Sequence, residues 1–274
     1  MKNADLHTHS IYSDGIFTPK ELAKKAKEKG IKYLALTDHN SVEGVREAVM
    51  YGKELGIEII PGVEVLSDWG EVIGYFIDIN NEGLLNILEH NKKEVNNGTR
   101  FCIQELRKLG VDISYEEVKK EFPKYPMMYF FVAQILVKKD LLKSTDELCG
   151  KYIGKLFTIK YNLLKTEEVI SAIRHAGGVA VLSHPFVGAN YKKEFKYMHN
   201  LVSAGLAGIE IENGYYKNYK KEIKNKILKL AKKYNLILTS GSDFHGGIVK
   251  SNLGDCMCDE NVVKNMKVRK ADEY

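Results

Sequence analysis

The sequence predicts an α/β fold, namely a parallel barrel of seven strands with a helical insertion. Strand and helix patterns alternate over the first 80 residues and again from about residue 166, which favours a barrel over an α+β sandwich. Between these two parts the pattern is helical, with little strand signal. We therefore divide the chain into a first barrel part (1–78), a helical cap insertion (79–165) and a second barrel part with a C-terminal tail (166–274).

The first barrel part has four expected strands and two expected helices. Thr18 is a good N-cap, Pro19 suits the first helical position, and Glu21 completes a capping box. The helix that begins there is expected to end at Gly30. The strands are expected at residues 4–6, 31–37, 57–65 and 72–77, and the second helix at 41–55.

The remaining segments form the insertion and the second barrel part. In the insertion we expect helices at 83–109, 114–121 and 127–137, and such insertions usually contribute to substrate selection. The last 20 residues are polar and are expected to be irregular. The second barrel part is expected to contain helix 166–176, strand 179–183, helix 191–204, strand 207–212, helix 217–233 and strand 236–240.

Composition narrows the class of protein. The 274 residues include 44% hydrophobic residues, which is ordinary for a globular protein with a sizeable core. No apolar run reaches the roughly 18 residues of a membrane span. A strand is expected directly after Met1, so we expect no signal peptide. The four cysteines are interpreted as reduced thiols. We expect a cytoplasmic protein that contacts no membrane.

Lysines supply much of the formal net charge of +5, and many of them lie in residues 217–233. Ile223, Ile227 and Leu230 recur there at helical spacing, so this segment is interpreted as a solvated lysine face over an apolar stripe. Because it lacks interleaved aromatic residues and a motif, binding of long nucleic acid is not expected. The mild positive balance suits an anionic substrate.

Histidines and acids gather at the ends of the expected strands. His7 and His9 are two residues apart, so an extended strand directs both imidazoles to one side, and Asp14 follows shortly. Because the carboxyl ends of the strands of a parallel barrel meet at one mouth, we expect one cluster of these side chains. Its other members are His39, Glu64, His184, Asp243 and His245.

This set of side chains predicts a metal centre. Mixed nitrogen and oxygen ligands favour zinc, manganese or iron over calcium or magnesium. Eight ligands are too many for one ion and suffice for two or three, with Glu64 placed to bridge them. Adjacent ions about 3.5–4 Å apart generate a hydroxide and clamp the oxygens of a phosphoryl group, so hydrolysis of a phosphate ester is the expected chemistry.

The ordered motifs DLHTHS-x2-SDG, TDHN, PGVE, SHP and GSDFHG resemble those of the PHP (polymerase and histidinol phosphatase) family of metal-dependent phosphoesterases. The resemblance covers residues 1–78 and 166–250. It implies a distorted seven-stranded β/α barrel with a trinuclear Mn, Zn or Fe site. It also implies three ligand sets: His7, His9, Glu64 and Asp243; then Asp14, His39 and His245; then Glu64 and His184.

One departure from the family concerns a metal ligand. The family usually has histidine in an H-x-x-G-Y pattern on the fourth strand, whereas this chain has Glu71 at that position. We expect Glu71 to replace the imidazole, which makes the site harder and favours Mn or Fe over Zn. The alternatives are an exposed strand glutamate and loss of the third metal.

A second departure concerns the substrate. The insertion resembles that of the subgroup acting on nucleotides and short oligonucleotides, which includes 3′,5′-nucleoside bisphosphate phosphatases and 5′–3′ exonucleases. That subgroup has Arg-Pro-His before an apolar helix, where this chain has Tyr129-Phe130-Phe131-Val132-Ala133. We interpret this aromatic run as core, with stacking on a base as the alternative. Arg100 keeps the position of a family arginine and is the candidate phosphate contact, with a solvated helix residue as the alternative.

We therefore expect a hydrolase of a phosphate monoester or terminal phosphodiester of a nucleotide or short oligonucleotide, acting through a metal-bridged hydroxide. Two or three Mn, Fe or Zn ions are the expected cofactors. No side-chain nucleophile is needed, and Asp14 and Asp243 are candidates for proton handling. The alternatives are a small-metabolite phosphatase, for example of histidinol phosphate, and a regulatory PHP domain with an incomplete metal site.

Overall fold

A computed structural model describes residues 2–122, 129–185, 191–214, 221–246 and 251–272. It divides into two compact units, of which the first comprises residues 1–88 and 164–274 and the second residues 89–163. The domain boundaries expected after residues 78 and 165 stay predictions. The expected helix segments 127–128 and 217–220 lie outside the described residues.

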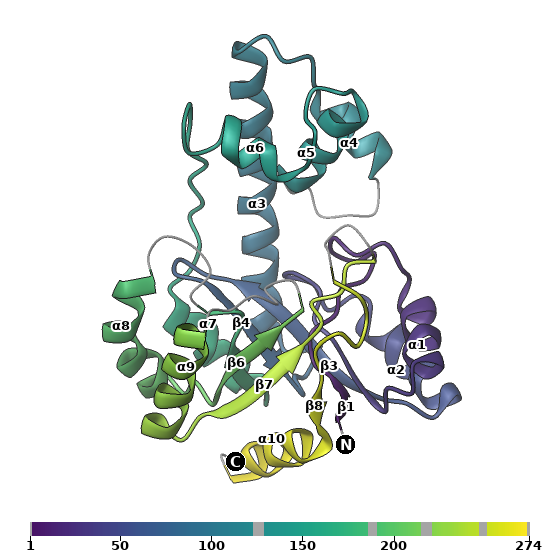
Figure 1. The fold of residues 1–274 in the computed structure, drawn as a ribbon, viewed down its shortest axis with the longest axis vertical. Helices are drawn as coiled ribbons and strands as arrows, with labels where there is room; N and C mark the ends of the chain where they lie inside the picture. Colours follow the sequence, from purple (N-terminus) through teal and green to yellow (C-terminus); the bar gives the residue numbers. More distant parts are fainter. Residues whose placement is uncertain (1, 123–128, 186–190, 215–220, 247–250, 273–274) are drawn as a thin grey trace. The chain divides into compact units, whose positions relative to one another are not determined.

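A mixed sheet forms the centre of the first unit (Figure 1). The seven expected strands are present, together with a short eighth strand, and the hydrogen-bonded order is β7-β6-β5-β4-β3-β2-β1-β8. The α/β barrel prediction is therefore confirmed in its coarse form. The strands are β1 (Lys2–Asp5), β2 (Tyr33–Leu36), β3 (Glu58–Leu66), β4 (Glu71–Tyr75), β5 (Val179–Leu182), β6 (Gly208–Asn213), β7 (Ile237–Gly241) and β8 (Cys258–Asp259).

The prediction of a wholly parallel barrel is wrong at β4. This strand runs antiparallel to both neighbours, with Ile73 opposite Glu64 on β3 and Val181 on β5. Only a short turn joins β3 to β4, where Ser67 N–H donates to the Gly70 carbonyl at 2.9 Å. A turn of this length makes a hairpin, because parallel strands need a long crossover. The start of β4 therefore lies beside the end of β3.

The two edges of the sheet meet beyond the ends of β1 and β7. Thr8 and Phe244 form a parallel bridge, and the Asp243 N–H donates to the His7 carbonyl at 2.8 Å. Close to the end of β7, the Ser240 N–H lies 2.8 Å from the Cys258 sulfur of β8. The sheet is thus nearly closed, and its closure places the segment after β7 directly beside the segment after β1.

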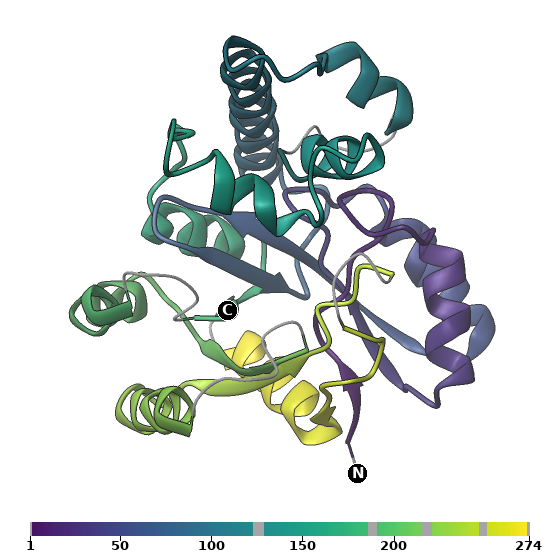
Figure 2. The ribbon, with the colours of Figure 1, turned by 45° about the horizontal axis from the view of Figure 1, so that its top comes forward.

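Helices surround this sheet in the first unit. At the start of α1, Thr18 Oγ1 accepts the Glu21 N–H at 3.2 Å and the Glu21 carboxylate accepts the Thr18 N–H at 2.9 Å, so the predicted capping box is confirmed. Helices α1 and α2 lie side by side (Figures 1 and 2). The helices are α1 (Pro19–Glu28), α2 (Val45–Leu55), α7 (Thr166–His175), α8 (Tyr191–Ser203), α9 (Lys221–Tyr234) and α10 (Glu260–Asp272).

The prediction of an irregular C-terminal segment is wrong, because β8 and α10 lie there. Val263 and Met266 of α10 are buried in one apolar cluster with Leu6 and Val181 of the barrel. Helix α10 therefore packs against the barrel interior, at the end where β1 begins (Figure 2). Two buried apolar positions in a polar helix are a weak pattern, so the sequence alone does not predict this contact.

The second unit is helical and has its own core. Helix α3 (Glu82–Lys108) begins in the first unit and continues into the second, followed by α4 (Tyr115–Glu121), α5 (Tyr129–Lys138) and α6 (Asp146–Lys151), the last of which was not predicted. Phe131 is buried with Leu106 of α3, and Tyr129 and Phe130 pack against the same cluster. The interpretation of this aromatic run as core is confirmed. None of the described helices combines the length and apolar character needed to cross a membrane.

Candidate metal centre

Five histidines and four carboxylates from separate strand ends lie together in the first unit. Six of the nine residues are buried, and His39, Glu71 and His184 are partly buried. Their potential ligand atoms form four overlapping groups, each with its atoms within 4.8 Å of one another. The groups are His9, Asp14, His39 and His245; His7, His184 and Asp243; His7, His9 and Glu64; and His39, Glu64 and Glu71.

The first group surrounds Asp14. The Nε2 atom of His245 lies 3.2 Å from Asp14 Oδ1, and His39 Nε2 lies 3.7 Å from Asp14 Oδ2. His9 presents Nδ1 at 3.7 Å from the same carboxylate, and its ring stacks on that of His245 with centroids 4.1 Å apart. Three imidazoles therefore surround a single acid.

Two of the other three groups contain Glu64, whose carboxylate is fully buried. Its Oε2 lies 3.0 Å from His7 Nε2 and 3.4 Å from His9 Nε2. His184 Nε2 lies 3.1 Å from the other oxygen, Oε1. Asp243 Oδ1 faces the same two imidazoles, 3.5 Å from His7 Nε2 and 3.2 Å from His9 Nε2.

Glu71 reaches the cluster because β4 is antiparallel. As the first residue of β4, it lies at the edge where the parallel strands end. Its carboxylate oxygens lie 3.4 Å from His39 Nδ1 and 3.2 Å from His184 Nε2. Glu71 thus occupies a position from which a carboxylate can ligate a metal, although its role as a ligand stays a prediction.

Buried polar atoms without hydrogen bonds support a metal at this cluster. Within the described part of the chain, His9 Nε2, Asp14 Oδ1 and His39 Nδ1 are buried and make no hydrogen bond of normal geometry. Burying such atoms unsatisfied costs free energy, so native proteins rarely retain them without a purpose. Imidazole nitrogens and carboxylate oxygens are the donors preferred by Zn, Mn and Fe, so these residues fit such ions.

Burial and mutual charge set the pKa values of the cluster. Burial opposes protonation of His7, but the carboxylates of Glu64, Asp243 and Glu210 outweigh it and hold its pKa well above the usual range. Burial also opposes protonation of His245, but Asp14 outweighs it and raises its pKa to about 9. Burial, together with the neighbouring His245 and His39, lowers the pKa of His9 to about 4.

The pKa values of the acids in the cluster are lowered by the imidazoles around them. Burial raises the pKa of a carboxyl group, but the imidazoles around Asp14 and Asp243 outweigh it and hold both pKa values well below the usual range. The pKa of Glu64 is also held well below its usual range, because His7 and His39 outweigh its burial. These acids are therefore charged at neutral pH, as metal ligands must be.

Comparison with known proteins identifies the family of this chain. The model of the PHP domain family matches residues 5–273. The chain belongs to the PHP domain family. The family predicted from the sequence motifs is therefore confirmed, and with it the expected hydrolysis of phosphate esters.

Two relatives and one solved structure are similar to this PHP-family chain. A 5′-3′ exoribonuclease of Haemophilus influenzae is 28% identical, with 89% of this chain and 90% of that protein covered. A 3′,5′-nucleoside bisphosphate phosphatase of Chromobacterium violaceum is also 28% identical, with 89% and 88% covered. A solved structure from Bifidobacterium adolescentis, 22% identical, covers 98% of this chain and 96% of its own with a TM-score of 0.88, and shows the same fold.

Three buried acids around the PHP cluster were not among the predicted site residues. Asp38 accepts the Ser10 N–H at 2.6 Å and the Ser13 hydroxyl at 2.7 Å, which orders the turn that carries Asp14. Asp5 accepts the Ser242 N–H at 2.8 Å. Burial raises the pKa of both Asp5 and Asp38 to about 6. Both lie inside the recognised motifs, whereas the third acid, Glu210 of β6, lies in no motif.

The candidate phosphate contact Arg100 lies on α3 in the second unit. Its guanidinium carbon lies 3.5 Å from the centroid of the Tyr115 ring. The Tyr115 hydroxyl in turn donates to Asn96 Oδ1 at 2.9 Å. Stacking occupies the face of the guanidinium, whereas its N–H groups point outward in the plane and can still donate hydrogen bonds. The role of Arg100 as a phosphate contact stays a prediction.

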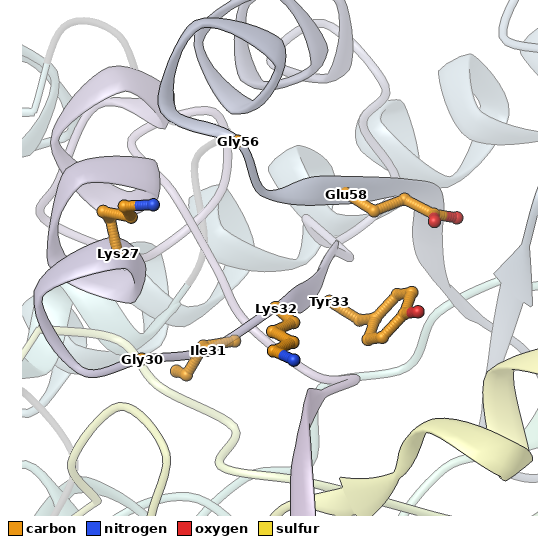
Figure 3. A pocket seen from close by; sticks show the side chains of 7 residues that line it. All are labelled: Lys27, Gly30, Ile31, Lys32, Tyr33, Gly56 and Glu58. Carbon is orange, nitrogen blue, oxygen red and sulfur yellow. The ribbon is translucent and has the colours of Figure 1, made fainter.

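A hollow at the opposite end of the strands is separate from the cluster. The hollow has a volume of about 430 Å³. Figure 3 shows the residues that line it, among them Tyr33 and Glu58, which begin β2 and β3. The metal-type residues lie after β2 and within the later part of β3. The hollow is lined by Lys27, Gly30, Ile31, Lys32, Tyr33, Gly56 and Glu58.

Proposed function

We propose that this chain hydrolyses a phosphate monoester or terminal phosphodiester of a nucleotide or short oligonucleotide, using two or three divalent metal ions. The sharing of one buried carboxylate, that of Glu64, by several imidazoles carries the proposal. A carboxylate in this position suits a bridge between adjacent metal ions. The names of two relatives, an exoribonuclease and a nucleoside bisphosphate phosphatase, support the substrate class.

The residues divide naturally among the ions. His7, His9, Glu64 and Asp243 would hold one ion, and Asp14, His39 and His245 a second. Glu64, Glu71 and His184 would hold a third. When bound, such ions lower the pKa of water, so that a nucleophile forms at neutral pH, and they neutralise the charge of phosphoryl oxygens. Because Glu71 adds an oxygen ligand, Mn or Fe is favoured over Zn.

The chain's own groups position the reaction and set its charge. The imidazoles and carboxylates are held at strand ends by the sheet, so little reorganisation is needed when a phosphate enters. Asp14 and Asp243 were candidates for proton handling. Their depressed pKa values make them weak proton acceptors. We therefore assign both residues to metal binding rather than to proton transfer.

A substrate panel with added Mn²⁺ tests this function. Phosphate release is measured from nucleoside monophosphates, 3′,5′-bisphosphates, 5′-phosphorylated dinucleotides and histidinol phosphate. We expect turnover of one nucleotide class, while turnover of histidinol phosphate alone would favour a small-metabolite phosphatase. If metal binds but no phosphate is released from any compound, the chain is a regulatory domain.

The variant His9→Ala is the matched loss-of-function test. It removes an imidazole that faces two groups of the cluster, so every activity on the panel should be lost. His199→Ala, at an exposed helical position away from the cluster, is the control and should retain activity. Full activity in His9→Ala would contradict the proposed mechanism.

A further inference from the structure

Glu210 is a buried acid that contacts two members of the metal cluster without belonging to a motif. It lies on β6, and its side chain is fully buried. Its Oε1 lies 3.2 Å from His7 Nδ1. Its Oε2 accepts the backbone N–H of His184 at 2.9 Å and the Asn213 Nδ2 amide at 3.0 Å. One carboxylate therefore contacts one imidazole of the cluster and the backbone of another.

The two nitrogens of His7 face in different directions. Nε2 faces Glu64 Oε2 at 3.0 Å and Asp243 Oδ1 at 3.5 Å, on the side where the ligand atoms meet. Nδ1 faces Glu210 on the other side. If Nδ1 donates its proton to Glu210, Nε2 keeps a free lone pair for a metal.

We propose that Glu210 is a positioning residue that fixes His7 in the tautomer with Nδ1 protonated and holds His184 in place for metal binding. This inference rests on the proposed metal-dependent function. Glu210 itself does not ligate the metal or touch the substrate. It acts through His7, by selecting which nitrogen is offered, and through the His184 backbone.

The His184 contact adds a second reason for an acid at this position. His184 has a φ of 20°, which residues other than glycine rarely adopt. Its N–H donates to Glu210 Oε2, which stabilises this backbone conformation and the direction of the imidazole. His184 Nε2 in turn lies 3.1 Å from Glu64.

Only a carboxylate satisfies all of these donors. Glutamine has the same shape but presents one NH₂ group, which cannot accept a hydrogen bond. If the NH₂ faces His7, then Nδ1 must accept, and Nε2 carries the proton that blocks the metal. If the NH₂ faces His184, two hydrogen-bond donors oppose each other, because the backbone N–H of His184 cannot rotate away. Either orientation weakens the metal site.

The test compares Glu210→Gln with Glu212→Gln. Glu212 lies two residues away on the same strand and pairs with Lys224 at 2.8 Å and Lys2 at 3.4 Å. Glu212→Gln therefore controls for the loss of one negative charge from β6. Affinity for Mn²⁺ is measured by competition with a chelator, and the Co²⁺ complex by visible absorption. We expect about 10–100-fold weaker binding and an altered Co²⁺ spectrum in Glu210→Gln alone.

Three results separate this inference from the proposed function. If the wild-type chain binds neither ion, both are wrong. If the wild type and Glu210→Gln bind equally with identical Co²⁺ spectra, the role of Glu210 is wrong while the proposed function stands. If both Gln variants weaken binding equally, the effect is one of charge and the positioning role is wrong.

A measurement on the wild type keeps the inference testable if Glu210→Gln does not fold. Histidine ¹⁵N NMR of the Zn²⁺-loaded chain reports which ring nitrogen carries the proton, and the spectrum of His7→Gln assigns the His7 signals. We expect a protonated Nδ1 and a metal-bound Nε2 in His7. Metal binding through Nδ1 would overturn the proposal.

Discussion

The carboxylate of Glu64 illustrates how single residues define this site. It is fully buried and lies within 3.4 Å of His7, His9, His39 and His184. The Ser183 hydroxyl also donates to its Oε1 at 2.6 Å. A buried charge is stable only when it is paired and hydrogen-bonded, and these neighbours provide both conditions. Glu71 has fewer such contacts, which makes it the residue whose role most needs a test.

Substitution of Glu71 tests whether it ligates a metal. Glu71→Ala should lower the metal content by one ion per chain, because only Glu64 and His184 would then hold the third ion. Glu71→His should keep the content, preserve or improve activity, and shift preference toward Zn, because an imidazole replaces an oxygen ligand. Metal content after dialysis against Mn²⁺ or Zn²⁺ measures both effects.

Glu58→Ala is the control for these variants, because Glu58 lies at the start of β3, away from the metal cluster, and pairs with Lys267. An unchanged metal content in Glu71→Ala would identify Glu71 as a strand glutamate outside the metal site.

At the scale of elements, close packing of strand ends brings the candidate ligands together. Gly241 ends β7 directly against the segment that follows β1. A Cβ atom at Gly241 would lie 2.2 Å from His7 Cβ and 2.4 Å from His7 N. No side chain fits there, so glycine permits the approach that joins the two edges of the sheet.

Gly241→Ala should therefore lower both stability and metal affinity. Overpacking of this kind costs about 1–3 kcal/mol, and the shift falls on the backbone of a predicted ligand. Urea unfolding and Mn²⁺ titration measure the two effects. Gly150→Ala, where a Cβ would meet nothing within 4 Å, is the control. Wild-type metal affinity in Gly241→Ala would show that the closure does not position His7.

Helix α3 carries the one arginine predicted to contact the substrate. If Arg100 binds a phosphate, Arg100→Ala should raise KM by roughly tenfold or more with a smaller effect on kcat, since a charge-assisted hydrogen bond contributes about 1.5–3 kcal/mol. Steady-state kinetics on the preferred compound of the panel measures this. Arg107→Ala, at an exposed position on the same helix, is the control. Equal KM values in both variants and the wild type would leave Arg100 as a residue that only stacks on Tyr115.

At the scale of the whole molecule, the cluster links stability to pH. In the metal-free chain, protonated imidazoles balance the buried carboxylates. The pKa of His245 is raised to about 9 from its ordinary value of 6.5. Between these values the folded chain binds more protons than the unfolded chain, so stability falls as pH rises.

Metal-free protein should therefore be less stable at pH 9 than at pH 6.5. The contribution of His245 is fully present below pH 6.5 and is lost as pH rises through 9, a change on the order of 3 kcal/mol. Urea unfolding in the presence of a chelator, at both pH values, measures the loss. His245→Gln should reduce this dependence, and an identical dependence in the variant would contradict the assignment.

Local patterns in the sequence predict much of the fold and of the candidate site. The capping box at Thr18 and the alternation of strands and helices are local, so both are visible without a structure. The histidines and acids of the cluster follow strands directly, so their convergence follows from the barrel prediction. Helix α10 has too few apolar positions to indicate its packing. The β3–β4 hairpin contains no helix between its strands, so the alternation of strands and helices gives no signal that β4 reverses direction.

The sequence alone determined the family and the kinds of side chain that gather in the candidate metal centre, because short motifs carry both. The tertiary structure decided what depends on register between distant strands. The direction of β4 brings Glu71 to the cluster, and the pairing of β6 beside β5 brings Glu210 against His7 and His184. Such contacts join residues about 26 to 203 positions apart, and no local pattern encodes which of many buried acids will meet a given imidazole.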